Sequence, residues 1–213
     1  MTYNNDYIVP LENITFFTSF AMTKKAIVFL ANGTEEMEFT ISADILRRAK
    51  VDVTVVGVEL EKDKPAICAN GTKILPDILL TDKELEGNLS YDAGVVPGGL
   101  KGSHTCRDNK KVQAIIKNLY DQKKIVAFIC AGTLVAKASG IPKGHTVTSY
   151  PAVMDQLTDT YEYSQERVVV DKNVITSRAP GTSFLFALTI VENLVGKEAA
   201  DQLKKDMLTS SVL

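Results

Sequence analysis

The sequence predicts an α/β fold in which helices cover both faces of a mostly parallel sheet. From Lys24 onward, short β-branched and apolar runs alternate with helical stretches, a pattern typical of buried parallel strands. A second feature is the apolar run 125–129, which passes into Cys130 and two further small residues and then into a helical segment. A strand that turns directly into a helix forms a sharp elbow at the carboxyl edge of the sheet.

The predicted elements follow from local patterns along the chain. A continuous apolar run predicts the first buried strand, and a basic last turn predicts the end of the first helix. Clustered Pro, Gly and Asn residues predict a short hairpin. We expect strands at 26–30, 51–58, 91–96, 125–129 and near 146–149, a hairpin within 64–76, an antiparallel pair at 161–170 and 174–177, and helices at 35–49, about 109–121, after Cys130, after Pro180 and after Lys197.

Length and charge limit the domain number and the partners. A chain of 213 residues with 45% hydrophobic residues is suited to one core, so we expect a single domain over residues 22–213. The net charge of -2, from 24 basic and 26 acidic residues, gives no sign of a surface for nucleic acid or anionic membranes. A small molecule or another protein is the expected partner, and no apolar run is long enough to predict a membrane span.

The first 21 residues are expected to be a disordered or alternative N-terminal extension. They contain no Lys or Arg but include Asp6 and Glu12, and Met22 offers a second start. This composition disfavours a secretory or transit signal, with a non-standard targeting signal as the alternative. The three cysteines show no C-x-x-C spacing, which disfavours disulfides and a zinc site and favours a reducing compartment.

Cys130 is the candidate nucleophile because it occupies the predicted elbow. The N–H groups and dipole of the following helix are expected to lower the pKa of its thiol. A buried, unreactive cysteine is the alternative interpretation.

Two loops are expected to meet Cys130 at the carboxyl edge of the sheet. Residues 32–38 could direct a carboxyl group toward it, and the glycines of residues 97–99 could turn the N–H of Gly99 toward an oxyanion. With the N–H of Ala131, that would make a two-donor oxyanion hole. Taken alone, residues 32–38 are equally explained as an acidic helix start, and residues 97–99 as an ordinary turn.

Four ordered motifs make the chain resemble a known family. They are NGTEEMEF, VVPGG, FICAG and TSRAPGTSF, and from Lys24 to the C-terminus the chain is similar to the redox-responsive, parkinsonism-associated DJ-1 branch of the PfpI superfamily. The resemblance implies a flavodoxin-like three-layer sandwich, an obligate homodimer and a reactive elbow cysteine. It also implies cofactor-free glyoxalase and protein deglycase activities, in the cytoplasm and also in the nucleus and mitochondrion.

The resemblance assigns the family's cysteine to Cys130 and its glutamate, which donates a hydrogen bond to the sulfur, to Glu38. Because a carboxylate would repel a thiolate, one partner must hold a proton, and burial favours the neutral carboxyl. The remaining matched residues have secondary roles. The resemblance implies that Glu35 is a second carboxyl close to the site and that the pocket is lined by Gly98, Arg178 and Pro180. It places Met37 and Cys68 toward the dimer interface. Arg178 is equally interpreted as a loop anchor, and Cys106 matches no motif.

One departure from the family pattern removes a possible triad. Tyr150 stands where many relatives have a histidine beside the cysteine, so we expect Glu38 to act alone as acid and base. His104 could reach the pocket rim as a substitute base or could be a surface residue, and His145 is expected to face solvent. No metal site is expected.

The residues leave two functions open. The first is an enzyme that converts methylglyoxal or glyoxal to a hydroxy acid through a hemithioacetal on Cys130. The second is a redox sensor or chaperone, in which Cys130 is oxidised to a sulfinate and signals through the homodimer. A class I glutamine amidotransferase is excluded, since neither histidine opens an H-x-E motif.

Overall fold

A seven-stranded sheet forms the centre of the computed structural model, which describes residues 23–81 and 90–209. The predicted extension at residues 1–21 lies outside these residues. Neighbouring strands are parallel, except that β10 runs antiparallel to β11. Across the sheet the order is β10 (Val168–Asp171), β11 (Val174–Ser177), β7 (Ile125–Ile129), β6 (Ala93–Val96), β1 (Lys25–Leu30), β2 (Asp52–Gly57) and β5 (Ile78–Leu79).

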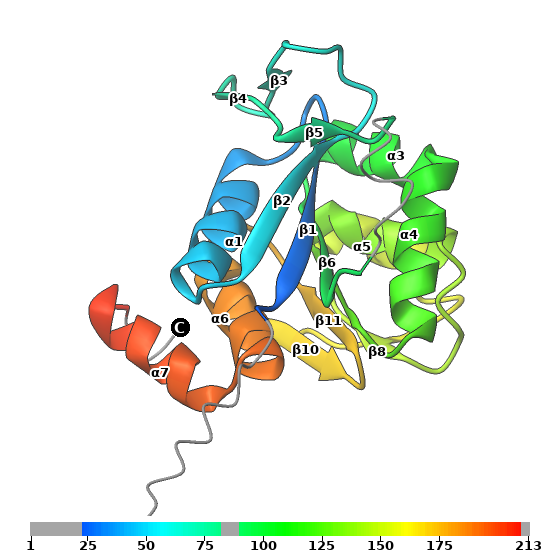
Figure 1. Cartoon of the computed structure of the whole chain (residues 1–213). Helices are drawn as coiled ribbons and strands as arrows, with labels where there is room; N and C mark the ends of the chain where they lie inside the picture. Colours follow the sequence, from blue (N-terminus) through cyan, green and yellow to red (C-terminus); the bar gives the residue numbers. More distant parts are fainter. Residues whose placement is uncertain (1–22, 82–89, 210–213) are drawn as a thin grey trace, which may run out of the picture.

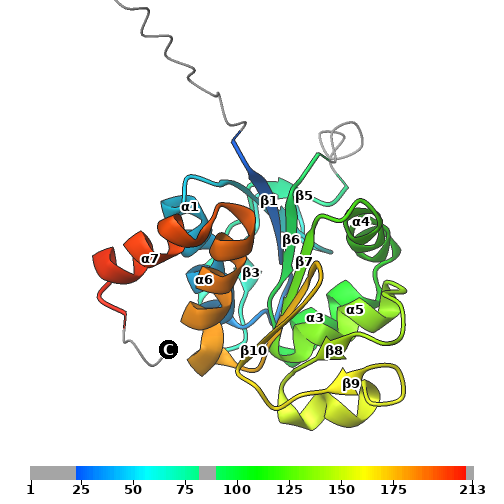
Figure 2. The same cartoon turned by 90° about the horizontal axis from the view of Figure 1, so that it is seen from below.

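Helices cover both faces of this sheet, as Figures 1 and 2 show. One face carries α1 (Glu36–Arg48) and α6 (Ser183–Leu194), with α7 (Lys197–Asp206) packed beside α6. The other carries α3 (Leu100–Asp108), α4 (Lys110–Asp121) and α5 (Thr133–Ala138). The predicted three-layer α/β sandwich is therefore confirmed.

The main elements form where the apolar pattern predicts them. In β1, every residue from Ala26 to Leu30 is fully buried, as expected for a central parallel strand. In α1, Phe39, Ala43 and Leu46 are buried at helical spacing and turn one face toward the core. The Asn109 side chain accepts the first N–H groups of α4 and sets its start.

Three short elements differ from the predictions. α3 was not predicted, since the polar sequence LKGSHTCRD has little apolar periodicity; it forms where Gly102 approaches the Thr34 backbone so closely that an added Cβ would lie 2.6 Å from its nitrogen. The segment 161–170 was expected to pair antiparallel with 174–177, but its first part, β9 (Glu162–Tyr163), pairs in parallel with β8 (Thr146–Val147). Only β10 makes the expected antiparallel pair. The two-residue strand β5 was also missed.

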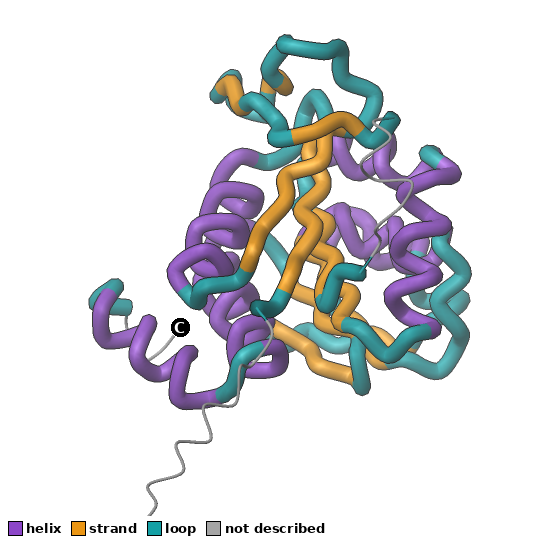
Figure 3. Tube along the Cα trace, in the orientation of Figure 1, coloured by secondary structure: helices purple, strands orange, loops and turns teal. Residues whose placement is uncertain are grey.

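The predicted hairpin is present as a separate two-stranded sheet. It pairs β3 (Ala66–Ile67) with β4 (Lys73–Ile74) and lies at the end of the molecule where the chain leaves β2 (Figure 3). Within the described ranges, the longest apolar stretches in helices fall short of what a membrane crossing requires.

Candidate active site

Cys130 lies on a tight turn between β7 and α5. It begins a 3-10 turn, Cys130–Gly132, and adopts φ 61°, which is unusual for a residue other than glycine. The turn fits against the end of β6 only because Gly132 has no side chain, since an added Cβ would lie 2.5 Å from the carbonyl oxygen of Val96. The predicted elbow is therefore present, with the cysteine 9% exposed.

Glu38 lies in the first turns of α1 and is completely buried. Its Oε2 accepts a hydrogen bond of 2.7 Å from the N–H of Gly98. Burial raises the pKa of Glu38 to about 8, and the nearby charge of Glu35 acts in the same direction against the hydrogen bond from Gly98. The carboxyl group therefore holds a proton at neutral pH.

The loop after β6 brings Glu38 and Cys130 together. A Cβ added to Gly98 would lie 2.5 Å from the Cys130 Cβ and 2.9 Å from its sulfur, and it would also overlap Glu38 Oε2. Gly99 adopts φ 82°, and a Cβ there would lie 2.5 Å from the nitrogen of Glu35. Both positions therefore require glycine, because neighbouring atoms leave no room for a side chain. A larger residue at either position would separate the carboxyl from the thiol.

Two backbone N–H groups face the sulfur of Cys130. They belong to Gly99 and Ala131, the pair predicted as an oxyanion hole, and their hydrogen bonds act to lower the thiol pKa. Burial and the charge of an ionised Glu38 outweigh them and raise the pKa of Cys130 to about 12. The expected lowering of the thiol pKa is therefore wrong, because desolvation of the buried sulfur outweighs the helix-terminus donors.

The carboxyl and the thiol titrate as a pair. The repulsion that raises the Cys130 pKa requires an ionised Glu38, and Glu38 is protonated until about pH 8. A protonated Glu38 instead offers an O–H donor to the sulfur. The thiolate therefore forms most readily while Glu38 keeps its proton.

Glu35 supports this arrangement from the helix cap. Its side chain accepts the N–H of Glu38 at 2.7 Å, and its own N–H donates to the carbonyl of Gly98 at 3.0 Å. It is 9% exposed. Glu35 thus fixes the start of α1 against the glycine loop.

The raised pKa of Glu38 predicts a specific dependence of stability on pH. Between the ordinary carboxyl pKa of 4.5 and about 8, the unfolded chain has lost the proton that the folded protein keeps, so stability falls as pH rises through this window. Glu38→Gln should remove this fall, which is on the order of 5 kcal/mol. Urea unfolding at pH 5, 7 and 9 measures it, with Asp44→Asn on the exposed face of α1 as control. Parallel curves for wild type and Glu38→Gln would contradict the prediction.

The other predicted pocket residues lie in different surroundings. Tyr150 is 46% exposed, and its carbonyl accepts the Ser149 hydroxyl at 3.0 Å. Arg178 donates through Nη1 to the carbonyl of Gln165 at 2.7 Å, which is the arrangement of a loop anchor. Pro180 opens a 3-10 turn and is partly buried. Their place in the pocket stays a prediction.

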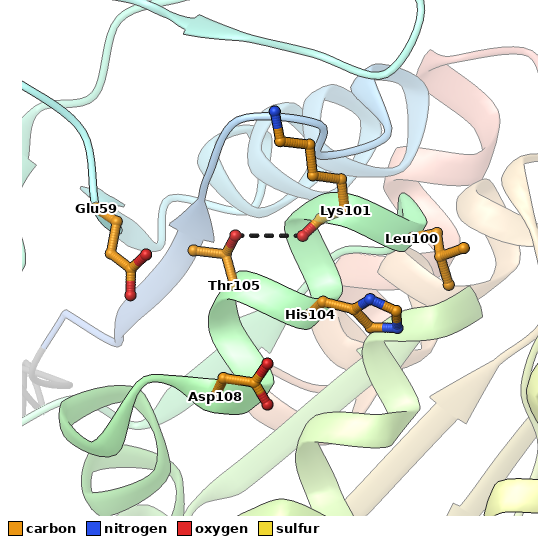
Figure 4. Close-up of a pocket in the computed structure, with 6 residues that line it drawn as sticks. All are labelled: Glu59, Leu100, Lys101, His104, Thr105 and Asp108. Atoms are coloured by element: carbon orange, nitrogen blue, oxygen red, sulfur yellow. Dashed lines mark hydrogen bonds between the residues drawn. The ribbon is translucent and has the colours of Figure 1, made fainter.

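The two histidines differ from one another. His104 and Asp108 extend from α3 toward a hollow of about 450 Å³ whose lining includes neither Cys130 nor Glu38 (Figure 4). His145, predicted to face solvent, is instead 2% exposed, with its ring nitrogens 2.9 Å from the Tyr120 hydroxyl and 3.0 Å from Asp171. That prediction is wrong, because these partners come from distant parts of the chain.

The other cysteines are buried free thiols. Burial raises the pKa of Cys68 to about 11 and of Cys106 to about 12. Nearby carboxylates act in the same direction, Glu36 and Glu35 on Cys68 and Glu59 on Cys106. In the two described ranges no cluster of three His, Cys, Asp or Glu residues could hold a metal ion.

The sequence and the fold were compared with those of known proteins. The model of the DJ-1/PfpI family matches residues 24–193. The chain belongs to the DJ-1/PfpI family. It is 44% identical over 187 residues to the "Parkinson disease protein 7 homolog" of Danio rerio, covering 87% of this chain and 97% of the relative.

Two further DJ-1 proteins are similar in sequence or structure. The "Glutathione-independent glyoxalase DJ-1" of Schizosaccharomyces pombe is 32% identical, over 86% of this chain and 97% of its own. The crystal structure of Drosophila melanogaster DJ-1beta has a TM-score of 0.83 at 39% identity, covering 89% of this chain and all of that one. The resemblance to the DJ-1 branch is therefore confirmed.

Proposed function

We propose that this protein is a cofactor-free glyoxalase that converts methylglyoxal or glyoxal to the corresponding hydroxy acid. The observation that carries the proposal is a buried carboxyl, Glu38, with a pKa of about 8 beside a cysteine whose sulfur faces two N–H donors. A group with this pKa can donate and accept protons near neutral pH. Relatives in Schizosaccharomyces pombe and Caenorhabditis elegans named glutathione-independent glyoxalases support the substrate class.

The first step is addition of the Cys130 sulfur to the aldehyde carbon. Cys130 first releases its thiol proton to solvent and reacts as the thiolate. A carbon–sulfur bond forms, the carbonyl π-bond breaks, and the oxygen takes a proton from Glu38, which leaves a hemithioacetal and an ionised carboxylate. The N–H groups of Gly99 and Ala131 are placed to stabilise the negative oxygen as it develops. The same addition would admit early glycation adducts, which is the protein deglycase form of this activity.

The second step moves hydrogen between the two carbons. The Glu38 carboxylate removes the proton from the hemithioacetal carbon, and the electron pair forms a carbon–carbon double bond as the neighbouring carbonyl π-bond breaks, which gives an enediolate. Glu38 returns this proton to the neighbouring carbon. The hydroxyl proton of the first carbon moves to the enediolate oxygen as the first carbonyl forms, which gives a thioester of the hydroxy acid. Water then hydrolyses the thioester and Cys130 recovers its proton, so aldehyde plus water becomes hydroxy acid with no external oxidant.

Methylglyoxal turnover by the purified chain without glutathione tests this proposal. We expect methylglyoxal consumption with one lactate formed per aldehyde, and Cys130→Ser should be reduced to the rate of buffer alone. Cys106→Ser, at another buried thiol, should retain activity. Absence of lactate from wild type, or equal turnover by Cys130→Ser, would overturn the proposal.

A redox sensor or chaperone is the second candidate, favoured by the same donors. The two N–H groups around the sulfur and a protonated Glu38 would also stabilise a sulfinate. Under mild peroxide we expect Cys130 to oxidise before Cys68 or Cys106 and to stop at the sulfinic acid. Peptide mass mapping measures the order, and preferential oxidation of either other cysteine would contradict it. Oxidation without any methylglyoxal turnover would favour the sensor.

We also propose that the chain forms a homodimer, as its family resemblance implies. Exposed apolar side chains lie at the start of α1 and on the hairpin, where Met37, Ile67 and Leu75 are 53%, 56% and 60% exposed. Glu36 joins the two elements by accepting the N–H of Asn70 at 3.0 Å. Light scattering should show twice the 23.2 kDa chain mass, and Ile67→Lys should lower it. A monomer at micromolar concentration would contradict this.

A further inference from the structure

A five-residue segment beside the elbow, residues 146–150, is here called the strap. β8 opens it, and the N–H of Thr146 donates to Asp171 Oδ2 at 2.8 Å. The strap ends at Tyr150, where the chain most clearly departs from the family pattern. Neither apolar periodicity nor a motif indicated how this segment is held.

The strap is bonded directly to the turn that carries the nucleophile. The hydroxyl of Thr133 donates to the carbonyl of Thr148 at 3.1 Å, and both residues are fully buried. The N–H of Thr133 in turn donates to the carbonyl of Cys130. On its other side, the N–H of Thr148 donates to the hydroxyl of Thr176 on β11 at 2.9 Å. The strap therefore lies between the elbow and the sheet.

A single phenol fixes the next residue of the strap. The Tyr163 oxygen donates to the carbonyl of Ser149 at 3.0 Å, accepts its N–H at 3.2 Å and lies 3.0 Å from its hydroxyl. Ser149 is completely buried. A phenylalanine at this position would leave a buried N–H and carbonyl without these partners.

We propose that Tyr163 is a positioning residue for Cys130, an inference that rests on the function proposed above. By holding Ser149 it keeps Thr148 in place to accept the hydroxyl of Thr133, and so keeps the first helical turn, with the N–H of Ala131, aligned on the sulfur. The elbow needs such support because Cys130 adopts φ 61°, a conformation that persists only where neighbouring residues impose it.

Tyr163→Phe tests this role through two readouts. We expect kcat for methylglyoxal to fall about tenfold with KM changed less than twofold, because the sulfur and its donor lose alignment in the transition state. The pH profile of Cys130 alkylation by iodoacetamide should move to higher pH, since the thiolate loses an N–H donor. The alkylation profile does not depend on glyoxalase activity, so it tests the positioning role even if wild type fails to turn over methylglyoxal.

Tyr161→Phe is the matched control. The Tyr161 side chain is buried, and its hydroxyl donates to the carbonyl of Ile141 at 3.0 Å. This variant loses an equivalent phenol two residues away, so it should lower the melting temperature without changing kcat or the alkylation profile. An equal effect of both variants would overturn the proposal, because it would show general destabilisation.

Thr133→Val removes the other end of the same connection. It should reproduce the effect of Tyr163→Phe, and the double variant should be slower than either single variant by less than about twofold, since both act through one strap. Fully multiplied effects, or a Tyr163→Phe variant with the kcat and alkylation profile of wild type, would overturn the proposal.

Discussion

Glu38→Ala is expected to reduce kcat for methylglyoxal by about a hundredfold or more while changing KM little. The loss of a proton relay acts on the transition states for addition and for hydrogen transfer, and a positioned acid–base group typically contributes this much. Stopped-flow or continuous turnover assays at saturating aldehyde measure the change. The pH dependence controlled by the Glu38 pKa of about 8 should disappear from the remaining rate.

Glu36→Ala is the matched control for this variant. Glu36 lies two residues away on α1 and binds the hairpin through Asn70, so its removal should leave kcat within about twofold. A Glu38→Ala variant that keeps the wild-type rate and pH profile would contradict the assignment of Glu38 as acid and base.

Two further variants separate the acid–base mechanisms. Tyr150→Phe should cost at least about tenfold less in rate than Glu38→Ala, because Tyr150 is 46% exposed and its phenol is expected to offer a hydrogen bond rather than to relay protons. His104→Ala should leave turnover unchanged, since His104 faces a hollow lined by neither Cys130 nor Glu38. Loss of turnover in His104→Ala, with Cys130 still oxidisable, would replace the two-residue mechanism by a triad.

Gly98→Ala is expected to abolish most activity and to destabilise the fold. The new Cβ would lie 2.5 Å from the Cys130 Cβ and would overlap the Glu38 carboxyl, so the loop must move and separate the pair. Overpacking of this kind typically costs about 1–3 kcal/mol. The loss of alignment should lower turnover by about a hundredfold. Thermal unfolding and turnover of the same preparation measure both effects.

Gly181→Ala provides the control for stability. An added Cβ at Gly181 meets no atom within 4 Å, so the free energy of unfolding should change by less than about 0.5 kcal/mol. A Gly98→Ala variant as active and stable as wild type would show that the glycine loop does not need its close approach to Cys130.

The thiol pKa changes how the site is understood chemically. Helix-terminus donors alone would favour a thiolate, yet burial and an ionised Glu38 raise the pKa of Cys130 to about 12. Loss of the thiol proton therefore depends on the protonation of Glu38 as much as on the elbow. Thiolate formation at this site is a property of two residues rather than of one.

By itself, the sequence determined the elements whose cause is local. A wholly apolar run predicts β1, the spacing of Phe39, Ala43 and Leu46 predicts the buried face of α1, and an apolar strand passing into small residues predicts the elbow at Cys130. The loops that follow the strands predicted a carboxyl and a glycine turn near the elbow, whereas the choice of Glu38 came from the family resemblance. These patterns are readable because secondary-structure period and backbone freedom act over a few residues.

The tertiary structure decided what depends on residues far apart in the chain. Glu38 accepts a hydrogen bond from the N–H of Gly98, which is 60 positions away in the chain. Burial of Glu38 beneath such distant segments raises the pKa of its carboxyl to about 8. The tertiary structure likewise decided the burial of His145 and the hydrogen bonds between Tyr163 and Ser149 of the strap. Desolvation and long-range hydrogen bonds arise only when the layers pack together, so no local pattern could have shown them.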